Sequence, residues 1–236
     1  MNQESSDRLD ERISPAGSIG QVRLWTVDLS AAPRHMRPAA DTLSDDERVR
    51  ASRFRFDVHR RRFVAARAAL RTVLADVVGT SPARICFQYS VRGKPSLADG
   101  LGAPEFNLSH SDDLAVIAVS VEAAVGVDVE CIRPVAELEG IISKYFSPAE
   151  QAVILADARE APHAFFRYWT LKEAWLKTDG TGLSGLVSSV EVIRAPDGTA
   201  RLRHVGGAAL PYVLHEWVPR PGFAAALAVA SIHSPA

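Results

Sequence analysis

WTLKEAWLKTDGTGL, residues 169–183, is a strongly helical run that ends in glycines. On an α-helix Trp169, Glu173 and Lys177 lie four residues apart, so they share one face. A Glu followed by a Lys at this spacing is also the usual pattern of a solvated helix surface, where the pair contributes only a few tenths of a kcal/mol. Gly180 and Gly182 are expected to end the helix. A further carboxylate pair upstream raises the functional interest of Glu173.

That pair lies in GVDVE, residues 126–130. Val127 and Val129 alternate with Asp128 and Glu130, so on a β-strand the two carboxylates share one face, about 7 Å apart. Like charges this close are unfavourable unless solvent, a cation or a proton separates them. An ordinary half-buried strand with one wet face explains the pattern equally well. If an ion is bound, oxygen ligands without a nearby Cys or His favour Mg²⁺ over zinc.

A basic region lies nearer the start of the chain. Between Arg48 and Arg71 there are nine arginines and a single acidic residue, Asp57, whereas the net charge of the whole chain is only −1. Apolar residues from Phe63 onward recur at helical spacing and predict a buried helix face. Three arginines fall together on another side of this helix: Arg60, Arg67 and Arg71. The region fits a solvated face, a nucleic-acid-binding surface, or a site for a phosphorylated ligand and an acidic protein.

Two sequences predict capped helix starts. Ser44 can cap a helix with Glu47 as its partner three residues later. Ser147 precedes Pro148, a residue favoured at the first helical position, and Glu150 completes a second capping box. Capping is a sufficient explanation for Glu150, although a carboxylate at a helix start can also face a metal site.

The remaining pattern predicts strands separated by turns. Residues up to about Gly20 are polar and are expected to form a mobile tail. A turn at RGKP is expected to expose Lys94. The expected strands are Val22–Leu29, Arg84–Ser90, Leu114–Ser120 and then an antiparallel meander of Val190–Arg194, Arg201–Val205, Tyr212–Val218 and Phe223–Ser231.

Composition excludes several classes of protein. The chain has 236 residues, of which 47% are hydrophobic, so it can bury a substantial core;. Its two cysteines cannot build a disulfide framework and favour a reducing compartment;. The first residues lack the apolar core of a secretory signal, and no apolar run approaches the length of a membrane span.

Five motifs occur in an order that resembles one enzyme family. They are GKP (93–95), FNLSHS (106–111), GVDVE (126–130), FSPAE (146–150) and WTLKEAWLK (169–177) with its trailing GTGL. Together they are similar to the 4′-phosphopantetheinyl transferases of the larger, surfactin-synthetase-activating (Sfp-like) type, over about Leu43 to Leu183. The resemblance implies an α+β fold, a pseudo-dimeric pair of similar lobes (21–121 and 122–236) with the active site in the cleft between them, after a tail of residues 1–20.

The resemblance also implies a reaction. The family transfers the 4′-phosphopantetheine group from coenzyme A to a serine of apo acyl or peptidyl carrier proteins, requires Mg²⁺, and releases adenosine 3′,5′-bisphosphate. By the resemblance, the metal ligands are Asp128, Glu130 and Glu173. The residues expected to contact coenzyme A are Arg50, Arg62, Lys94, Ser109, His110, Asp128, Lys172 and Lys177. The residues expected to act in catalysis are Glu150, Glu173 and Lys177.

Alternative explanations exist for two of these roles, those of Glu150 and His110. Glu150 is the expected acceptor of the serine proton, with a metal-bound water as the alternative, and Lys177 is expected to neutralise or protonate the leaving phosphate. A lone histidine such as His110 is more often structural than functional. Hydroxyl, imidazole and ammonium donors nevertheless suit phosphate oxygens, which agrees with the expected contacts of Lys94, Ser109 and His110.

Two other functions remain open from the residues alone. One is nucleic-acid binding through Arg48–Arg71, although this stretch matches no recognised module. The other is a carboxylate–Mg²⁺ hydrolase that cleaves coenzyme A with water. The family resemblance argues against both and implies a cytoplasmic monomer whose partners are coenzyme A and carrier proteins, without a nucleic-acid or membrane partner.

Overall fold

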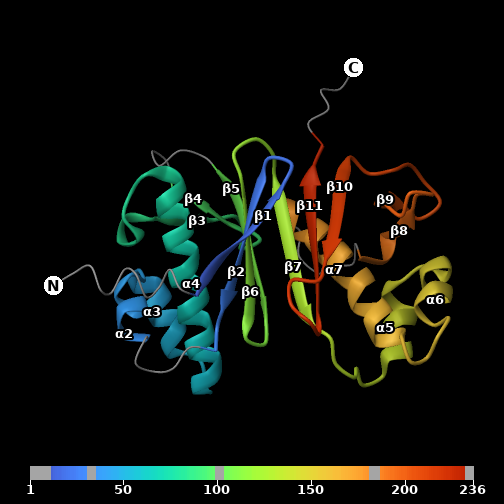
Figure 1. Cartoon of the computed structure of the whole chain (residues 1–236), viewed down its shortest axis with the longest axis horizontal. Coiled ribbons are helices and arrows are strands. Elements are labelled where there is room, and N and C mark those ends of the chain that lie inside the picture. Colours follow the sequence, from blue (N-terminus) through green and yellow to red (C-terminus); the bar gives the residue numbers. More distant parts are fainter. Residues whose placement is uncertain (1–11, 31–35, 99–103, 181–186, 232–236) are drawn as a thin grey trace.

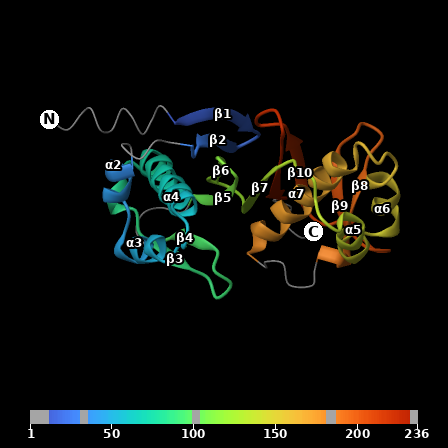
Figure 2. The same ribbon diagram turned by 90° about the horizontal axis from the view of Figure 1, so that it is seen from below.

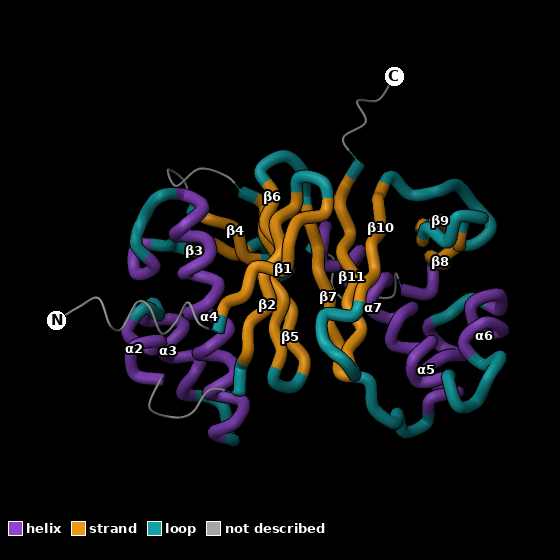
Figure 3. The backbone as a smooth tube through the Cα atoms, in the orientation of Figure 1, coloured by secondary structure: helices purple, strands orange, loops and turns teal. Residues whose placement is uncertain are grey.

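The computed structural model describes residues 12–30, 36–98, 104–180 and 187–231. Strands gather in the middle of the molecule and most helices lie at its two ends (Figure 1, Figure 3). The combination of helices with antiparallel sheets confirms the predicted α+β class. The division into similar lobes at residues 121 and 122 stays a prediction.

The N-terminal half of the chain, up to residue 120, forms an antiparallel sheet in the order β1-β2-β6-β5 and a separate β3–β4 hairpin. Its elements are β1 (Ile13–Ile19), β2 (Val22–Asp28), α2 (Met36–Asp41), α3 (Asp45–Ser52), α4 (Asp57–Val78), the short 3₁₀ helix η2 (Pro82–Arg84), β3 (Phe87–Tyr89), β4 (Pro95–Leu97), β5 (Glu105–Ser111) and β6 (Leu114–Ser120).

The C-terminal half, from residue 125, forms an antiparallel sheet in the order β10-β11-β7 and a second, two-stranded sheet of β8 and β9. Its elements are β7 (Val125–Cys131), α5 (Leu138–Tyr145), α6 (Pro148–Ile154), α7 (Ala161–Asp179), the 3₁₀ helix η3 (Val187–Ser189), β8 (Val190–Arg194), β9 (Ala200–His204), β10 (Tyr212–Trp217) and β11 (Phe223–Ala230).

Among the described residues, three apolar cores hold these layers together, and a fourth packs α2 and α3 against α4. One lies between α4 and the outer face of the first sheet, and another lies between α7 and the outer face of the second. A third core lies between the inner faces of the two sheets, where the β2 and β6 side chains meet those of β7 and β11. The resulting order of layers is helix, sheet, sheet, helix, which Figure 2 shows from below. The core between the two sheets includes Leu24, Val116, Val127 and Leu227, all nearly inaccessible to solvent.

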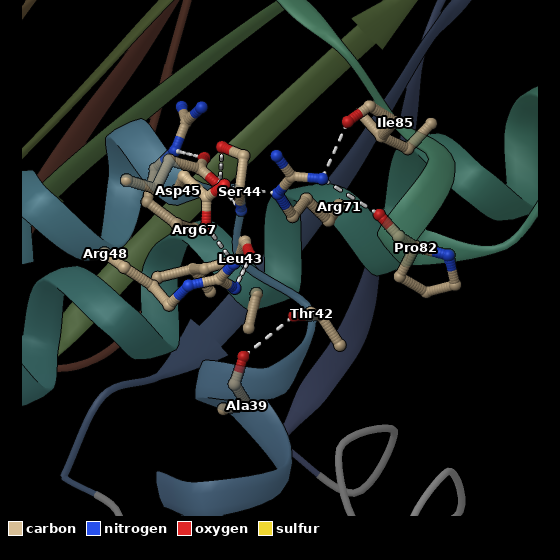
Figure 4. Close-up of polar contacts among 12 residues, drawn as sticks. Ala39, Thr42, Leu43, Ser44, Asp45, Arg48, Arg67, Arg71, Pro82 and Ile85 are labelled. Atoms are coloured by element: carbon tan, nitrogen blue, oxygen red, sulfur yellow. Dashed lines mark hydrogen bonds and ion pairs between the residues drawn. The ribbon is translucent and has the colours of Figure 1, made fainter.

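Helix α4 buries more of its surface than the sequence pattern predicts. Arg67 and Arg71 are buried, so the prediction that they form an exposed basic side with Arg60 is wrong for these two residues. The Nε atoms of Arg67 and Arg71 donate to the two carboxylate oxygens of Glu47, at 2.5 and 2.6 Å. Arg71 also donates to the carbonyl oxygens of Pro82 and Ile85 (Figure 4). Paired and hydrogen-bonded in this way, the charges can be buried.

The prediction of a tail up to Gly20 is wrong for residues 13–19, which form β1 antiparallel to β2. Its pairing shifts between Pro15 and Gly17, and an edge strand tolerates such a proline because one of its edges needs no partner;. The prediction of one continuous C-terminal meander is also wrong. Strand β8 pairs with β9, and β10 pairs with β11, but β9 and β10 belong to different sheets. The other edge of β11 pairs with β7.

Candidate active site

The carboxylates of β7 lie on the face that the alternation predicts. Val125, Val127 and Val129 are fully buried in the core between the sheets. Asp128 is only 3% exposed, and Glu130 is half-buried. Strand β7 therefore presents its two acidic side chains away from the core between the sheets.

Gly126 allows α7 to lie directly on β7. A Cβ atom at Gly126 would be 2.1 Å from the carbonyl oxygen of Ala174 and 2.5 Å from the backbone nitrogen of Thr178, so only glycine fits;. This close approach brings Glu173 and Lys177, one helical turn apart, to the strand that carries Asp128.

Lys177 and Ser109 converge on Asp128. The Nζ atom of Lys177 donates to Asp128 Oδ1 at 2.6 Å and to Ser109 Oγ at 2.8 Å. The hydroxyl of Ser109 donates to the same carboxylate oxygen at 2.8 Å. Three elements that are distant in sequence, β5, β7 and α7, thus each contribute one group to a single polar cluster.

Glu173 and Glu130 experience the negative charge of Asp128. Burial, together with the charges of Asp128 and Glu130, raises the pKa of Glu173 to about 7. Burial and the charge of Asp128 also raise the pKa of Glu130. The Oε1 atom of Glu173 and the Oδ2 atom of Asp128 are buried without a hydrogen-bond partner among the described residues. Buried oxygens left in this state are costly, and a bound cation would satisfy them.

The chemistry of these donors fits a hard cation. All the candidate donors are carboxylate oxygens, which Mg²⁺ prefers, and two of them are unsatisfied;. Within the described residues, however, no three acidic, His or Cys side chains converge closely enough to form a metal cluster. The positive charge beside Asp128 is instead that of Lys177, so the predicted Mg²⁺ ligands Asp128, Glu130 and Glu173 stay a prediction.

Comparison with known proteins identifies the family. The model of the "4′-phosphopantetheinyl transferase superfamily" matches residues 124–228, and that of "4′-phosphopantetheinyl transferase, N-terminal" matches residues 29–122. The 4′-phosphopantetheinyl transferase HetI of Nostoc sp. is 39% identical over 213 residues, covering 89% of this chain and 88% of the relative. The chain belongs to the 4′-phosphopantetheinyl transferase superfamily. It is therefore an enzyme of the transferase class.

Other phosphopantetheinyl transferases match at similar levels. The transferase psf-1 of Bacillus pumilus is 33% identical over 186 residues, covering 78% of each chain. Sfp of Bacillus subtilis is 34% identical over 148 residues, covering 58% of this chain and 64% of the relative. Among solved structures, the holo-[acyl-carrier-protein] synthase of Thermotoga maritima is 24% identical with a TM-score of 0.37, covering 46% of this chain and 64% of that one.

In this phosphopantetheinyl transferase, positively charged groups gather beside His110. The side chain of His110 reaches solvent, and desolvation of its inner part lowers the pKa of the imidazole, as do the charges of Lys177, Arg62 and Arg50. Arg62 forms an ion pair with Asp112 in the turn between β5 and β6. Arg50 lies over the ring of Phe63, 5.3 Å from its centre. The charges of the predicted contacts Arg50 and Arg62 therefore act on His110, although neither side chain is in contact with it.

Lys94 lies elsewhere than the turn pattern predicts. Its side chain is mostly buried rather than exposed, and its Nζ atom donates to the carbonyl oxygen of Thr178 near the end of α7. Its stem packs over Gly180, where an added Cβ would be 2.9 Å from Lys94 Cβ. Carbonyl groups at a helix C-terminus attract cations, which explains the change of position. Gly180 caps α7 as predicted, with a φ of 67°, whereas Gly182 lies outside the described residues.

Glu150 and Lys172 belong to a separate network of the transferase. Both are buried, and Lys172 Nζ donates to Glu150 Oε2 at 2.8 Å and to three backbone carbonyl oxygens. The backbone nitrogens of Ser147 and Val192 donate to the two oxygens of Glu150, at 2.8 and 2.7 Å. Lys172 lies on a different face of α7 from Glu173, and its side chain points into the core of the C-terminal half;. The structure therefore places neither residue with Asp128, and it confirms the capping box at Ser147.

Ser111 is a site residue that the motif analysis missed. Its hydroxyl donates to Glu130 Oε2 at 2.7 Å, in the same way that Ser109 donates to Asp128. A signal was present in the sequence, because serines 109 and 111 repeat with the same period of two as Asp128 and Glu130;. Ser111 is the last residue of β5, so it lies on the same strand as Ser109.

Proposed function

We propose that this protein transfers the 4′-phosphopantetheine group from coenzyme A to a serine of an apo acyl or peptidyl carrier protein, releasing adenosine 3′,5′-bisphosphate. One observation carries the proposal: Lys177 and Ser109 converge on Asp128 beside the unsatisfied carboxylate of Glu173. Such a cluster places a cation, a hydroxyl and acidic oxygens around one point, as phosphoryl transfer requires. Membership of the superfamily supports the choice of reaction.

Asp128, Glu130 and Glu173 are the residues that would hold Mg²⁺. When bound, the ion would ligate the diphosphate of coenzyme A and withdraw charge from the phosphorus under attack. The support is the pair of buried, unpartnered oxygens on Asp128 and Glu173. Ser109 and Ser111 hold the other carboxylate oxygens of β7 in fixed directions.

The phosphates of coenzyme A are proposed to bind to the basic groups around the cluster. Lys177 is available to neutralise the leaving phosphate, because its side chain is 31% exposed while its ammonium group contacts Asp128. Arg50, Arg62, His110 and Lys94 supply further donors. Arg62 and Lys94 are paired with Asp112 and with Thr178 and Glu105, so phosphate binding would replace these partners.

The serine proton is proposed to pass to Glu173. Glu173 lies beside Asp128, and a carboxylate that ligates Mg²⁺ through one oxygen can still accept a proton on the other;. Glu150 is less suitable, because its two oxygens already accept hydrogen bonds from Ser147, Val192 and Lys172. Glu173 and Lys177 then act on opposite ends of the reaction, one on the attacking hydroxyl and the other on the leaving phosphate.

The test is a reaction of the purified protein with coenzyme A, Mg²⁺ and an apo carrier domain. We expect the carrier to gain the mass of one phosphopantetheine and an equal amount of adenosine 3′,5′-bisphosphate to appear. A carrier with its acceptor serine replaced by alanine, and a reaction with excess chelator, should show neither product. Breakdown of coenzyme A without a gain of mass on the carrier would contradict the proposal and indicate a hydrolase.

A further inference from the structure

Strand β7 lies at the end of its sheet. Its first edge pairs with β11, and its second edge faces the N-terminal half of the protein. Alternate N–H groups of a strand point to each edge, so those on the second edge need other partners. The relevant groups are the N–H groups of Val127, Val129 and Cys131.

Side chains of β5 provide these partners. The N–H of Val127 donates to Asn107 Oδ1 at 2.9 Å, and the N–H of Val129 lies 3.4 Å from Ser109 Oγ. The N–H of Cys131 donates to Ser111 Oγ at 3.1 Å. The three acceptors share one face of β5 because they are two residues apart. We call Asn107, Ser109 and Ser111 the side-chain ladder.

Each side chain of the ladder suits the β7 residue beside it. The hydroxyls of Ser109 and Ser111 accept an N–H and also donate to a carboxylate, Asp128 or Glu130. A hydroxyl can do both, whereas an ionised carboxylate can only accept. Beside Asn107 the strand carries Gly126, which has no side chain to bind, so an acceptor oxygen is sufficient there.

We propose that Asn107 and Ser111 are positioning residues for phosphopantetheinyl transfer, because the ladder aligns β7 and fixes the direction of its carboxylates. The inference rests on the proposed function for its reaction. Ser111 acts through Glu130 and Cys131, and Asn107 acts through the backbone at Val127. All three ladder residues are buried, so solvent competes little for their hydrogen bonds;.

The first test replaces Ser111 by alanine in the full-length protein. We expect the Mg²⁺ concentration that gives half-maximal transfer to rise roughly 10- to 100-fold, the range typical of lost partners of metal-binding carboxylates. Mg²⁺ titrated calorimetrically into the protein with coenzyme A should show the same weakening. Ser111→Thr keeps the hydroxyl and should recover most of the affinity. Thr26→Ala removes a hydroxyl from β2 of the same sheet and should change neither quantity.

A double-mutant cycle tests whether Ser111 acts through Glu130. In a Glu130→Gln background, Ser111→Ala should cost much less than it costs alone, because the carboxylate that it orients is already absent. Equal losses in both backgrounds would overturn the proposal. So would a Ser111→Ala protein with a lower melting temperature but an unchanged requirement for Mg²⁺, because that result describes stability alone.

Hydrogen exchange tests the ladder independently of the reaction. Asn107→Ala should speed the exchange of the Val127 amide, and Ser111→Ala that of the Cys131 amide, while amides of β7 that face β11 keep their protection. Unchanged exchange at both positions would refute the ladder. If the wild-type protein modified no carrier while these exchange changes occurred, the proposed function would fail and the ladder would stand as structure only.

Discussion

Glu173 couples the stability of the protein to pH. Its pKa is raised from 4.5 to about 7 in the folded state, first by burial and then by the charge of Asp128. The folded state therefore holds this proton more tightly than the unfolded chain does, so the contribution of Glu173 to stability falls as pH rises through this interval;.

We expect the melting temperature of the wild-type protein, measured in chelator, to contain a component that decreases from about pH 5 to about pH 8. Glu173→Gln should remove that component, because glutamine does not ionise. The same variant should transfer at least about 10²-fold more slowly, since it has lost both a proposed Mg²⁺ ligand and the proposed proton acceptor. Melting curves of both proteins across this pH range make the measurement, and identical slopes would contradict the assignment.

For Glu150 we expect the opposite of Glu173: its replacement should lower stability rather than activity. Its carboxylate accepts three hydrogen bonds in the core, one of them from the buried ammonium group of Lys172. Glutamine would leave Lys172 without its counter-ion, and breaking a buried ion pair costs about 3 kcal/mol or more. We expect Glu150→Gln to be destabilised on this scale in urea unfolding, while the protein that remains folded retains transfer activity.

A double variant tests whether Glu150 matters as the partner of Lys172 or as the proton acceptor. Glu150→Gln combined with Lys172→Met removes both charges and should recover part of the lost stability. A Glu150→Gln protein with a native unfolding midpoint but a transfer rate lowered about 10²-fold would restore the role of Glu150 as the proton acceptor.

At the scale of elements, the contact between α7 and β7 depends on Gly126. Gly126→Ala would force α7 away from the strand, because the added carbon would meet the Ala174 carbonyl at 2.1 Å. We expect a destabilisation of about 3 kcal/mol, the upper part of the usual range for overpacking, and loss of transfer as Glu173 and Lys177 move from Asp128.

Gly140 in α5 is the matched control, because a carbon added there meets nothing within 4 Å. Gly140→Ala should leave transfer unchanged and stabilise the helix by about 0.5–1 kcal/mol. Urea unfolding and transfer rates of the two variants make the comparison. Similar behaviour of both would mean that α7 can move away from β7 without consequence.

Many of the helices and strands could be predicted from the sequence, because the patterns that indicate them lie within each element. Helical spacing placed α4, helical spacing and a glycine cap placed α7, and the alternation of Val127 and Val129 with acids placed β7. The errors concern partners far along the chain. The burial of Arg67 depends on Glu47, and the position of Lys94 depends on the end of α7. The cluster around Asp128 was predictable only through the family motifs.

At the scale of the whole molecule, Lys94 joins the two halves of the chain. It comes from the turn before β4 and contacts the backbone of α7 at Thr178. If Lys94 and His110 also bind phosphates, Lys94→Ala and His110→Ala should weaken the binding of coenzyme A more than the binding of the carrier. Calorimetry with each ligand measures both effects, and Arg92→Ala, an exposed cation in the same turn, is the control. Wild-type affinity for coenzyme A in both variants would leave Lys94 and His110 with structural roles only.

No helix in the described part of the chain has both the length and the apolar character needed to cross a bilayer. The core between the two sheets contains side chains from both halves of the chain. Leu24 and Val116 come from the N-terminal half, and Val127 and Leu227 come from the C-terminal half. Neither half can bury this apolar surface by itself, because separating the halves would expose the inner face of each sheet to water. We therefore expect unfolding to be cooperative across both halves, with a single transition in calorimetry. We also expect either half, expressed by itself, to aggregate through its exposed inner sheet face.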